Sequence, residues 1–248
     1  MTRIAMMVAR LFLKVPYYLY KISKAGSGKA GSLEEGYAWC KYATIKANRA
    51  GKVTIISSGI ENLPKKNGFV MFPNHQGLYD MLAFLESCPV PFSFVIKKEV
   101  KDIILLKQVI AATKSIPINR EDLRQSMQVI QTITEEVKKG RNFLIFAEGT
   151  RSKEGNKLLD FKGGSFKSAV KAKCPIVPCA LIDAYKPFDE ASIKPVTVRL
   201  QYLPAIYYDE YKDMKTTEIA EEVKSRIETA IFQQLEEITK NLDLAKSN

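Results

Sequence analysis

The sequence predicts an α/β fold in which helices flank a mixed, largely parallel β-sheet, preceded by an N-terminal amphipathic two-helix segment. From residue 52 onward, short apolar runs of strand length alternate with longer stretches of helical periodicity, as in sheets covered by helices on both faces. The 248 residues are 46% hydrophobic, enough to bury one large core. We therefore divide the chain into a two-helix motif at residues 1–51 and an α/β domain at residues 52–248.

The first segment has the pattern of a basic amphipathic helix. At about 100° per residue, its large apolar side chains fall on one face and its cations form a stripe on another. The apolar face comprises Ile4, Met7, Val8, Leu11, Val15, Tyr18, Leu19 and Ile22, and the stripe Arg3, Arg10, Lys14 and Lys21. Its uncharged run at residues 4–9 is far shorter than the roughly 20 residues of a membrane span. Pro16 should bend this helix.

A second helix should follow a flexible break at residues 25–31. Ser32 and Glu35 form a capping-box pattern, and the helix should run to about Arg49 and end near Gly51. It carries Tyr37, Trp39 and Tyr42, side chains that suit an interface between water and lipid. We predict that residues 1–51 dock on an anionic membrane surface. The alternative is a hairpin that packs on the protein's own core.

The elements of the α/β domain follow from the change in periodicity. Strands are predicted at residues 53–56, 69–72, 92–96, 115–118, 143–146, 176–182 and 196–202. Helices are predicted at residues 79–86, 101–112, 121–139, 164–172 and 217–241.

Composition narrows the partners. The net charge of +11 indicates an anionic partner, and the chain has no RNP-like aromatic box, zinc-finger spacing or long basic tract, so nucleic acid is not expected. The four cysteines have no CxxC spacing and the chain has one histidine, so no metal site is predicted. Reduced, mostly buried thiols in a cytosolic protein are expected.

That single histidine stands in Asn74-His75-Gln76-Gly77-Leu78-Tyr79-Asp80, after a predicted strand and before a predicted helix. Sites in such sheets lie at the carboxyl ends of strands. Two further strands end in polar residues. One delivers Glu148, Gly149, Thr150 and Arg151, and the other delivers Arg120. Two guanidinium groups near one imidazole suggest a phosphate site, because each can hold phosphate oxygens bidentately.

In this order the motifs resemble the glycerolipid acyltransferases, and most closely the bacterial 1-acylglycerol-3-phosphate (lysophosphatidate) acyltransferases. The resemblance rests on the N-H-x4-D block at residues 74–80, the block at 116–120, E-G-T-R at 148–151 and Val-Pro at 177–178. It covers about residues 53–200. The chain departs from the common pattern at Gly77, where Ser is frequent, at Asn119, where Asp is frequent, and at Ala147, where Pro is usual.

The resemblance implies transfer of an acyl chain from a thioester to the sn-2 hydroxyl of lysophosphatidate, giving phosphatidate for phospholipid biosynthesis. His75 would act as the general base and Asp80 would orient it. Lys97, Arg120, Glu148, Gly149, Thr150 and Arg151 would bind the acceptor. The donor would be acyl-CoA or acyl carrier protein, with no resident cofactor. The enzyme would lie on the cytoplasmic face of the cell membrane as a peripheral protein.

Two alternatives remain at this point. A related acyltransferase could act on glycerol 3-phosphate or another lysophospholipid. A non-enzymatic peripheral membrane protein would require the motifs to coincide by chance.

Overall fold

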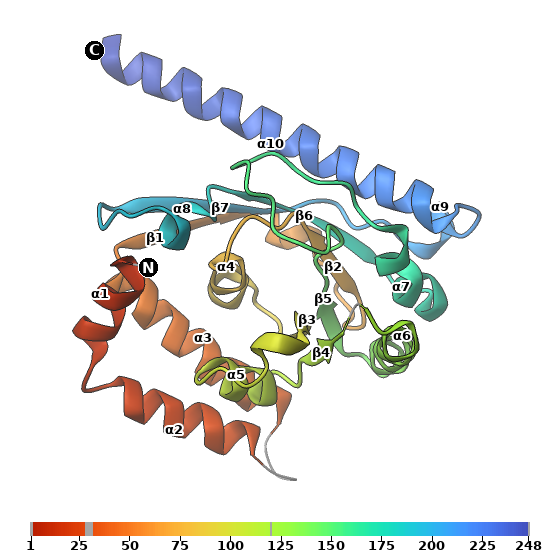
Figure 1. Ribbon diagram of the computed structural model, residues 1–248. Helices are drawn as coiled ribbons and strands as arrows, with labels where there is room; N and C mark the ends of the chain where they lie inside the picture. The colour runs from red at the N-terminus through yellow and green to blue at the C-terminus, as the bar shows by residue number, and fades with distance from the viewer. Residues whose placement is uncertain (1, 28–31, 120, 248) are drawn as a thin grey trace.

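The structure is a computed structural model that describes residues 2–27, 32–119 and 121–247 (Figure 1). Its centre is a seven-stranded sheet in the order β1-β7-β6-β2-β5-β3-β4. The strands are β1 (Val53–Ser58), β2 (Val70–Pro73), β3 (Phe92–Lys97), β4 (Ile116–Ile118), β5 (Asn142–Leu144), β6 (Ile176–Ile182) and β7 (Val196–Tyr202). Neighbouring strands are parallel except for β6 and β7, so β1 and β7 run opposite to the other five. The predicted mixed, largely parallel sheet is confirmed.

Helices cover both faces of this sheet (Figure 1). One face is covered by α6 (Leu123–Lys138), α7 (Lys167–Ala172) and α10 (Thr216–Ser247). The other is covered by α3 (Leu33–Ala50), α4 (Asp80–Ser87) and α5 (Leu106–Ala112), with α1 (Thr2–Leu11) and α2 (Val15–Gly26) outside them. Short elements connect these layers: η1 (Ile60–Asn62), η2 (Lys98–Val100), η3 (Gly163–Phe166), α8 (Lys186–Asp189) and α9 (Tyr208–Tyr211).

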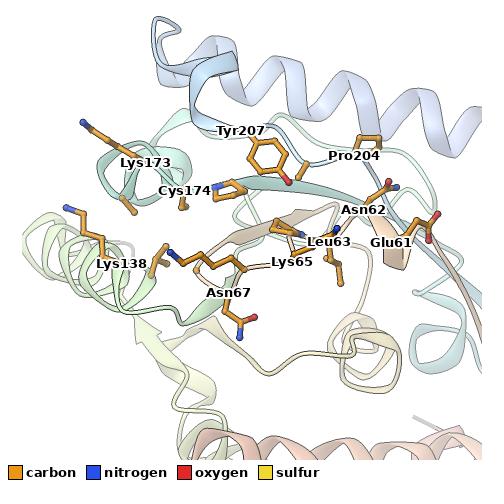
Figure 2. A pocket seen from close by; sticks show the side chains of 17 residues that line it. Glu61, Asn62, Leu63, Lys65, Asn67, Lys138, Lys173, Cys174, Pro204 and Tyr207 are labelled. Carbon is orange, nitrogen blue, oxygen red and sulfur yellow. The ribbon is translucent and has the colours of Figure 1, made fainter.

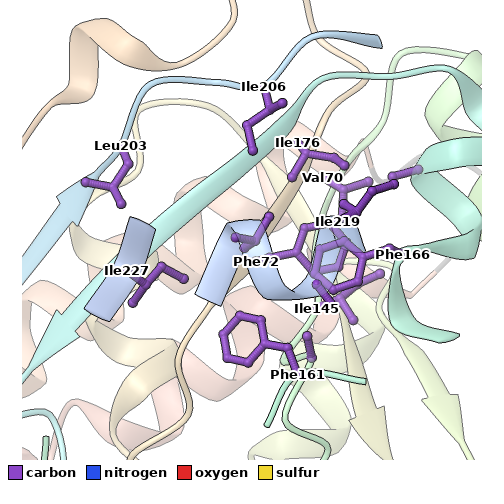
Figure 3. Packing of buried hydrophobic residues seen from close by; sticks show 14 of the residues in the cluster. Val70, Phe72, Ile145, Phe161, Phe166, Ile176, Leu203, Ile206, Ile219 and Ile227 are labelled. Atoms are coloured by element: carbon purple, nitrogen blue, oxygen red, sulfur yellow. The ribbon is translucent and has the colours of Figure 1, made fainter. Parts of the chain in front are cut away.

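Two hydrophobic clusters hold the layers together because alternate residues of each strand point to opposite faces. On β2, Val70 and Phe72 enter the cluster under α6, α7 and α10, whereas Met71 enters the cluster under α3 and α4. Figure 3 shows Phe72 and Phe166 packed together, with ring centroids 4.1 Å apart. Since β2 is buried on both faces, it fixes the loop that follows it.

The N-terminal segment differs from the prediction in its break points. The first helix ends at Leu11 and a new one begins at Val15, so Pro16 lies in the first turn of α2 and bends no continuous helix. A first-turn proline needs no N–H partner, which is why it is tolerated there. The α2 helix also continues through Ala25 and Gly26, and residues 28–31 of the predicted break lie outside the described part. The cap of α3 is confirmed: Ser32 Oγ accepts the Glu35 N–H at 3.1 Å.

Much of the predicted membrane face packs on the protein instead. Met7, Tyr18 and Ile22 are buried. Arg3, expected in the cationic stripe, is 1% exposed and donates to the carbonyl oxygens of Gly51, Pro187 and Lys194. The sequence could not show this, because those carbonyl groups come from distant segments. On α1, α2 and the turn between them, the exposed large apolar side chains are Val8, Phe12, Leu13, Tyr17 and Tyr20.

Within the α/β domain, the helix predicted at 101–112 is wrong in its first half. Residues 101–105 form turns, and α5 begins at Leu106, after Leu105 adopts a φ of 76° that a helix excludes. The start of the helix predicted at 164–172 is the 3₁₀ turn η3. All four cysteines are free and buried, and burial raises the pKa of the Cys40 and Cys174 thiols to about 12. Across the described residues, every helix is too short or too polar to cross a membrane.

Candidate active site

The single histidine contacts the carboxylate five residues after it. β2 ends at Pro73, His75 follows in the loop, and Asp80 is the first residue of α4. His75 Nδ1 lies 2.7 Å from Asp80 Oδ2. Because a carboxylate accepts, Nδ1 carries the ring proton, which makes Nε2 the basic nitrogen. The predicted pairing of His75 with Asp80 is present in the structure.

Asp80 is fixed by the loop that it closes. Its Oδ2 accepts the Gln76 N–H at 2.7 Å, and its Oδ1 accepts the Gly77 N–H at 2.9 Å. The residue is fully buried, and burial raises the pKa of its carboxyl above the usual value, while the hydrogen bonds from His75, Gln76 and Gly77 oppose that rise. The carboxylate therefore holds both the backbone and the imidazole.

The imidazole is also held by packing. Its ring stacks on Phe146, with centroids 4.0 Å apart and planes 21° apart. Phe146 follows β5, the neighbour of β2, and is itself buried. The His75 side chain is 21% exposed, so one part of the ring reaches solvent. The ring thus has a fixed plane and an open edge.

Glu148 supports His75 from beneath. Its Oε1 accepts the His75 N–H at 2.6 Å, and its Oε2 accepts the Leu159 N–H at 3.0 Å. The residue is 2% exposed, and burial raises the pKa of its carboxyl to about 7 despite these two bonds. Because both oxygens are engaged inside the protein, Glu148 joins the loop after β2 to the segment after β5.

A second set of side chains ties the same loop to the end of β6. Asn74 and Leu181 exchange two hydrogen bonds of 3.0 and 2.7 Å. Gln76 Oε1 accepts the Ala184 N–H at 2.7 Å, and its amide donates to Asn156 at 2.8 Å. Asn156 in turn donates to Asp183 at 3.0 Å. Sequence reasoning did not identify Asn156 or Asp183, since neither lies in a motif.

The E-G-T-R residues take different positions. Gly149 has a φ of 80°, a left-handed conformation that favours glycine, and Thr150 is exposed. Arg151 is partly exposed, and its Nη1 lies 3.7 Å from Asp189 Oδ1 on α8. A Cβ added to Gly77 would lie 3.0 Å from Asp189 Oδ2, so this ion pair borders the His75 loop. The added Cβ would also lie 3.0 Å from Tyr185 Cα, so this position has little room for a side chain.

Two predicted binding residues remain. Lys97 is exposed at the end of β3, which is separated from β2 by β5. Arg120 lies outside the described residues.

A cavity of about 810 Å³ lies at the opposite edge of the sheet (Figure 2). Its lining includes Gly68 and Pro175, which precede β2 and β6, together with Lys65, Lys138 and Lys173. Because His75 and Glu148 follow the other ends of β2 and β5, this cavity is no part of the chemistry.

A buried carboxylate, an oriented imidazole and a partly exposed arginine therefore lie near one another at one edge of an α/β sheet. An imidazole held in this tautomer can take a proton from a hydroxyl group, and a guanidinium group can bind an anion. Residues 54–182 match the sequence profile of the family described as Acyltransferase, about half of the chain. The chain belongs to this family, as the motifs predicted.

Several curated relatives carry one name. The 1-acyl-sn-glycerol-3-phosphate acyltransferase of Borreliella burgdorferi is 32% identical over 129 residues, which cover 52% of this chain and 51% of that protein. Its namesake from Helicobacter pylori is 28% identical over 165 residues, covering 66% and 69%. The chain thus spans about half the length of the first of these. The crystal structure of the 1-acyl-sn-glycerophosphate acyltransferase from Thermotoga maritima has the same fold, with a TM-score of 0.74 at 20% identity, covering 92% of this chain and 91% of that one.

Proposed function

We propose that this protein transfers a fatty acyl chain from an acyl thioester to the sn-2 hydroxyl of 1-acylglycerol 3-phosphate, giving phosphatidate. The observation that carries the proposal is the 2.7 Å contact between His75 Nδ1 and Asp80 Oδ2 inside the matched family region. The shared name of the curated relatives supports the choice of acceptor.

The proton inventory of this reaction fits one imidazole. Nε2 of His75 takes the hydroxyl proton as the alcohol oxygen attacks the thioester carbonyl, and Asp80 stabilises the imidazolium that forms. The new C–O bond then displaces the C–S bond, and the imidazolium returns its proton to the thiolate. His75 is the only histidine of the chain, so no second imidazole can activate a serine or cysteine. Direct transfer is therefore simpler than an acyl-enzyme.

Glu148 acts through His75 as a positioning residue. Its carboxylate holds the His75 backbone at 2.6 Å and is buried, which argues against direct contact with the acceptor. In this proposal, Glu148 positions His75 and does not bind the substrate, the role that the E-G-T-R motif implied.

The acceptor phosphate is assigned to Arg151, with Arg120, Lys97 and the backbone and hydroxyl of Gly149 and Thr150 as further candidates. Arg151 borders the His75 loop and is partly exposed, and its present partner Asp189 is 3.7 Å away, a distance too long for a strong pair. A phosphate dianion would replace this carboxylate as the partner of the guanidinium group.

Incubating the purified protein with lysophosphatidate and either acyl-CoA or acyl-acyl carrier protein tests the proposal. Phosphatidate is expected with at least one donor. Glycerol 3-phosphate and a lysophospholipid with a choline head group serve as parallel acceptors. Product from either of these, with none from lysophosphatidate, would move the activity to another acyltransferase class.

Arg151→Ala should raise KM for lysophosphatidate by about 10-fold, the modest effect of losing a charge-assisted contact at a partly exposed site. Lys153→Ala is the matched control, because Lys153 is an exposed cation two residues away. Equal KM values for the two variants would remove Arg151 from the phosphate site.

The N-terminal helices supply a membrane contact in this proposal, through a smaller surface than the sequence predicted. Phe12 and Leu13, in the turn between α1 and α2, are 68% and 88% exposed. Nearby, the Lys21 ammonium lies over the rings of Tyr17 and Trp39. Exposed apolar tips beside cations and aromatic rings are typical of peripheral proteins at an anionic leaflet. A cytoplasmic-face location is part of the same proposal.

Vesicle flotation tests this contact. Phe12→Ser combined with Leu13→Ser should weaken binding to phosphatidylglycerol vesicles several-fold, because two large apolar side chains would no longer enter the lipid. Ile60→Ser, in η1 at the other edge of the sheet, is the control. Deleting the residues that precede Lys24 is unsuitable as a test of membrane binding, since the deletion would also remove the buried Arg3. Unchanged vesicle binding by the double variant would show that Phe12 and Leu13 make no membrane contact.

A further inference from the structure

A second group of exposed apolar side chains lies in the segments that follow β3 and β4. Ile103, Ile104 and Leu105 are 50%, 78% and 49% exposed, in the turns between β3 and α5. Leu123 and Met127 are 79% and 70% exposed at the start of α6, which follows β4. We refer to these five residues as the apolar rim. Exposed large aliphatic side chains that gather at one edge of a sheet are unusual on a protein that meets only water.

The apolar rim is at the same edge of the sheet as His75. β3 and β4 run parallel to β2 and β5; β3 lies next to β5, and β4 lies next to β3 at the end of the sheet. The segments that follow β3 and β4 therefore emerge on the side where His75 and Glu148 follow β2 and β5. Leu123 and Met127, four residues apart, point to one side of α6.

The rim is also structurally continuous with the N-terminal helices. α2 packs directly on α5, close enough that a Cβ added to Gly26 would lie 2.8 Å from the Ala112 backbone nitrogen (Figure 1). Gly36 of α3 meets the same residue, and the other end of α3 meets α1, where Arg10 donates to the Ala50 carbonyl oxygen. Since α2 approaches Ala112 with its C-terminal end, the tip at Phe12 and Leu13 lies at the other end of α2. At the start of α1, Arg3 donates to Pro187 of α8, the helix whose Asp189 borders the His75 loop.

The charges around the rim suit an anionic partner. Lys97, Lys98, Lys101 and Lys107 flank Ile103–Leu105 and are exposed, against the carboxylates of Glu99 and Asp102. The contact between Lys101 and Asp102 is 4.0 Å long and solvent-exposed, so it neutralises little. In an anionic bilayer the phosphates lie above the acyl chains. Lysines around the exposed aliphatic side chains of the rim could therefore bind the phosphates while those side chains enter the acyl region.

The backbone of the apolar rim is strained at Leu105. Leu105 has a φ of 76°, a conformation that is unfavourable for a leucine, and its N–H is held by Gln108 at 2.7 Å. A burial requirement does not explain this strain, because Leu105 is half-exposed. Strained residues of this kind concentrate at functional surfaces.

We propose that the apolar rim is a second lipid-contacting surface, which inserts into an anionic leaflet next to His75 while the turn at Phe12 and Leu13 inserts on the other side of α2. This inference rests on the proposed function, because a lysolipid acceptor resides in the bilayer. With two contacts, the catalytic edge faces the lipid headgroups, and the acceptor reaches His75 without entering water.

Quenching of an introduced tryptophan tests the proposal without turnover. The chain has one tryptophan, so Trp39→Phe gives a silent background in which Ile104→Trp places an indole at the rim. Lys66→Trp in the same background places one at the opposite edge, beside the cavity of Figure 2. Vesicles of phosphatidylglycerol and phosphatidylethanolamine carry bromine on their acyl chains, which quenches only indoles that reach the hydrocarbon.

The indole introduced by Ile104→Trp should be quenched at least about twofold more strongly than the one introduced by Lys66→Trp, because only the rim enters the leaflet. Equal quenching at the two positions would overturn the proposal. A second result would also overturn it: the emission of the Ile104→Trp protein shifts when acyl carrier protein is added but not when vesicles are added. That result would make the rim a protein-docking surface. Because the readout is binding, a failure here leaves the phosphatidate assay unaffected, and a failed phosphatidate assay leaves the quenching result standing.

A second pair of variants guards against misfolding of the tryptophan proteins. Ile104→Ser combined with Met127→Ser should weaken vesicle binding several-fold. Phe232→Ser, which removes an aromatic ring 63% exposed on α10, should leave vesicle binding unchanged, since α10 packs on β6, which is separated from β3 and β4 by β2 and β5. Equal loss in both would contradict a specific rim.

Discussion

Glu148 should make the stability of the protein depend on pH in an unusual direction. Its carboxyl is 2% exposed, and its pKa is raised to about 7 from an ordinary value of 4.5, because burial disfavours the charged form more than its two backbone donors favour it. The folded protein therefore holds this proton more tightly than the unfolded chain does. The contribution of Glu148 to stability is fully present below about pH 4.5 and is lost as the pH rises through about 7.

The size of the effect follows from the two pKa values. A difference of about 2.5 units corresponds to about 3 kcal/mol of unfolding free energy across the full range. About 2 kcal/mol of this falls between about pH 5.5 and about pH 8, where many proteins stay folded. The comparison must use a variant that cannot titrate at this position, because other carboxyl groups also change over the range.

Glu148→Gln provides that comparison, since the amide has nearly the same shape and no charge. Urea unfolding followed by circular dichroism at several pH values gives the free-energy difference between wild type and Glu148→Gln. At low pH the wild type should be the more stable protein, because the hydroxyl oxygen of the neutral carboxyl can still accept one of the two N–H groups from His75 and Leu159, whereas an amide nitrogen can accept neither. That advantage should shrink by about 2 kcal/mol between about pH 5.5 and about pH 8. A difference that stays constant, or grows, with pH would refute the reasoning.

Three further predictions concern the site and its supports. Asp80→Asn should lower kcat by about 10³-fold with little change in KM, because the amide no longer selects the productive imidazole tautomer. Steady-state kinetics at saturating acceptor measure this, and an unchanged kcat would contradict the role of Asp80. Gly36→Ala should lower the free energy of unfolding by about 1–3 kcal/mol, because an added Cβ overlaps the Ala112 carbonyl oxygen. Gly164→Ala is the control, since its added Cβ meets open space and should leave the free energy of unfolding unchanged. Equal denaturation midpoints for the two variants would show that α3 and α5 separate freely. Ser32→Ala should cost about 1 kcal/mol through loss of the cap on Glu35, measured by the same unfolding experiment, and no change would mean that the start of α3 frays without consequence.

The predictable part of the structure is local in sequence. Period-two and period-3.6 patterns placed all seven strands to within a few residues, and five parallel strands brought His75 and Glu148 to one edge. The pairing of His75 with Asp80 was also predictable, because both lie in one short loop entering a helix. Capping at Ser32 required only residues three positions apart.

The parts that could not be predicted depend on contacts between distant segments. Arg3 has the position of a surface cation on a helical wheel, yet its partners come from residues 51, 187 and 194. Glu148 has the sequence context of a binding residue, and only the fold shows that both oxygens are used by backbone groups. Asp189 meets Arg151 through a short helix that no motif marks. Leu105, with its positive φ, delays the start of the helix predicted at 101–112 until Leu106.

The most direct test of the central claim compares wild type with His75→Ala at saturating lysophosphatidate and thioester donor, with circular dichroism to verify that both proteins fold. If His75 is the general base, phosphatidate forms with the wild type and kcat of the variant falls at least about 10²-fold, the low end of general-base contributions. Equal turnover by the two proteins would show that the imidazole held by Asp80 is not the base.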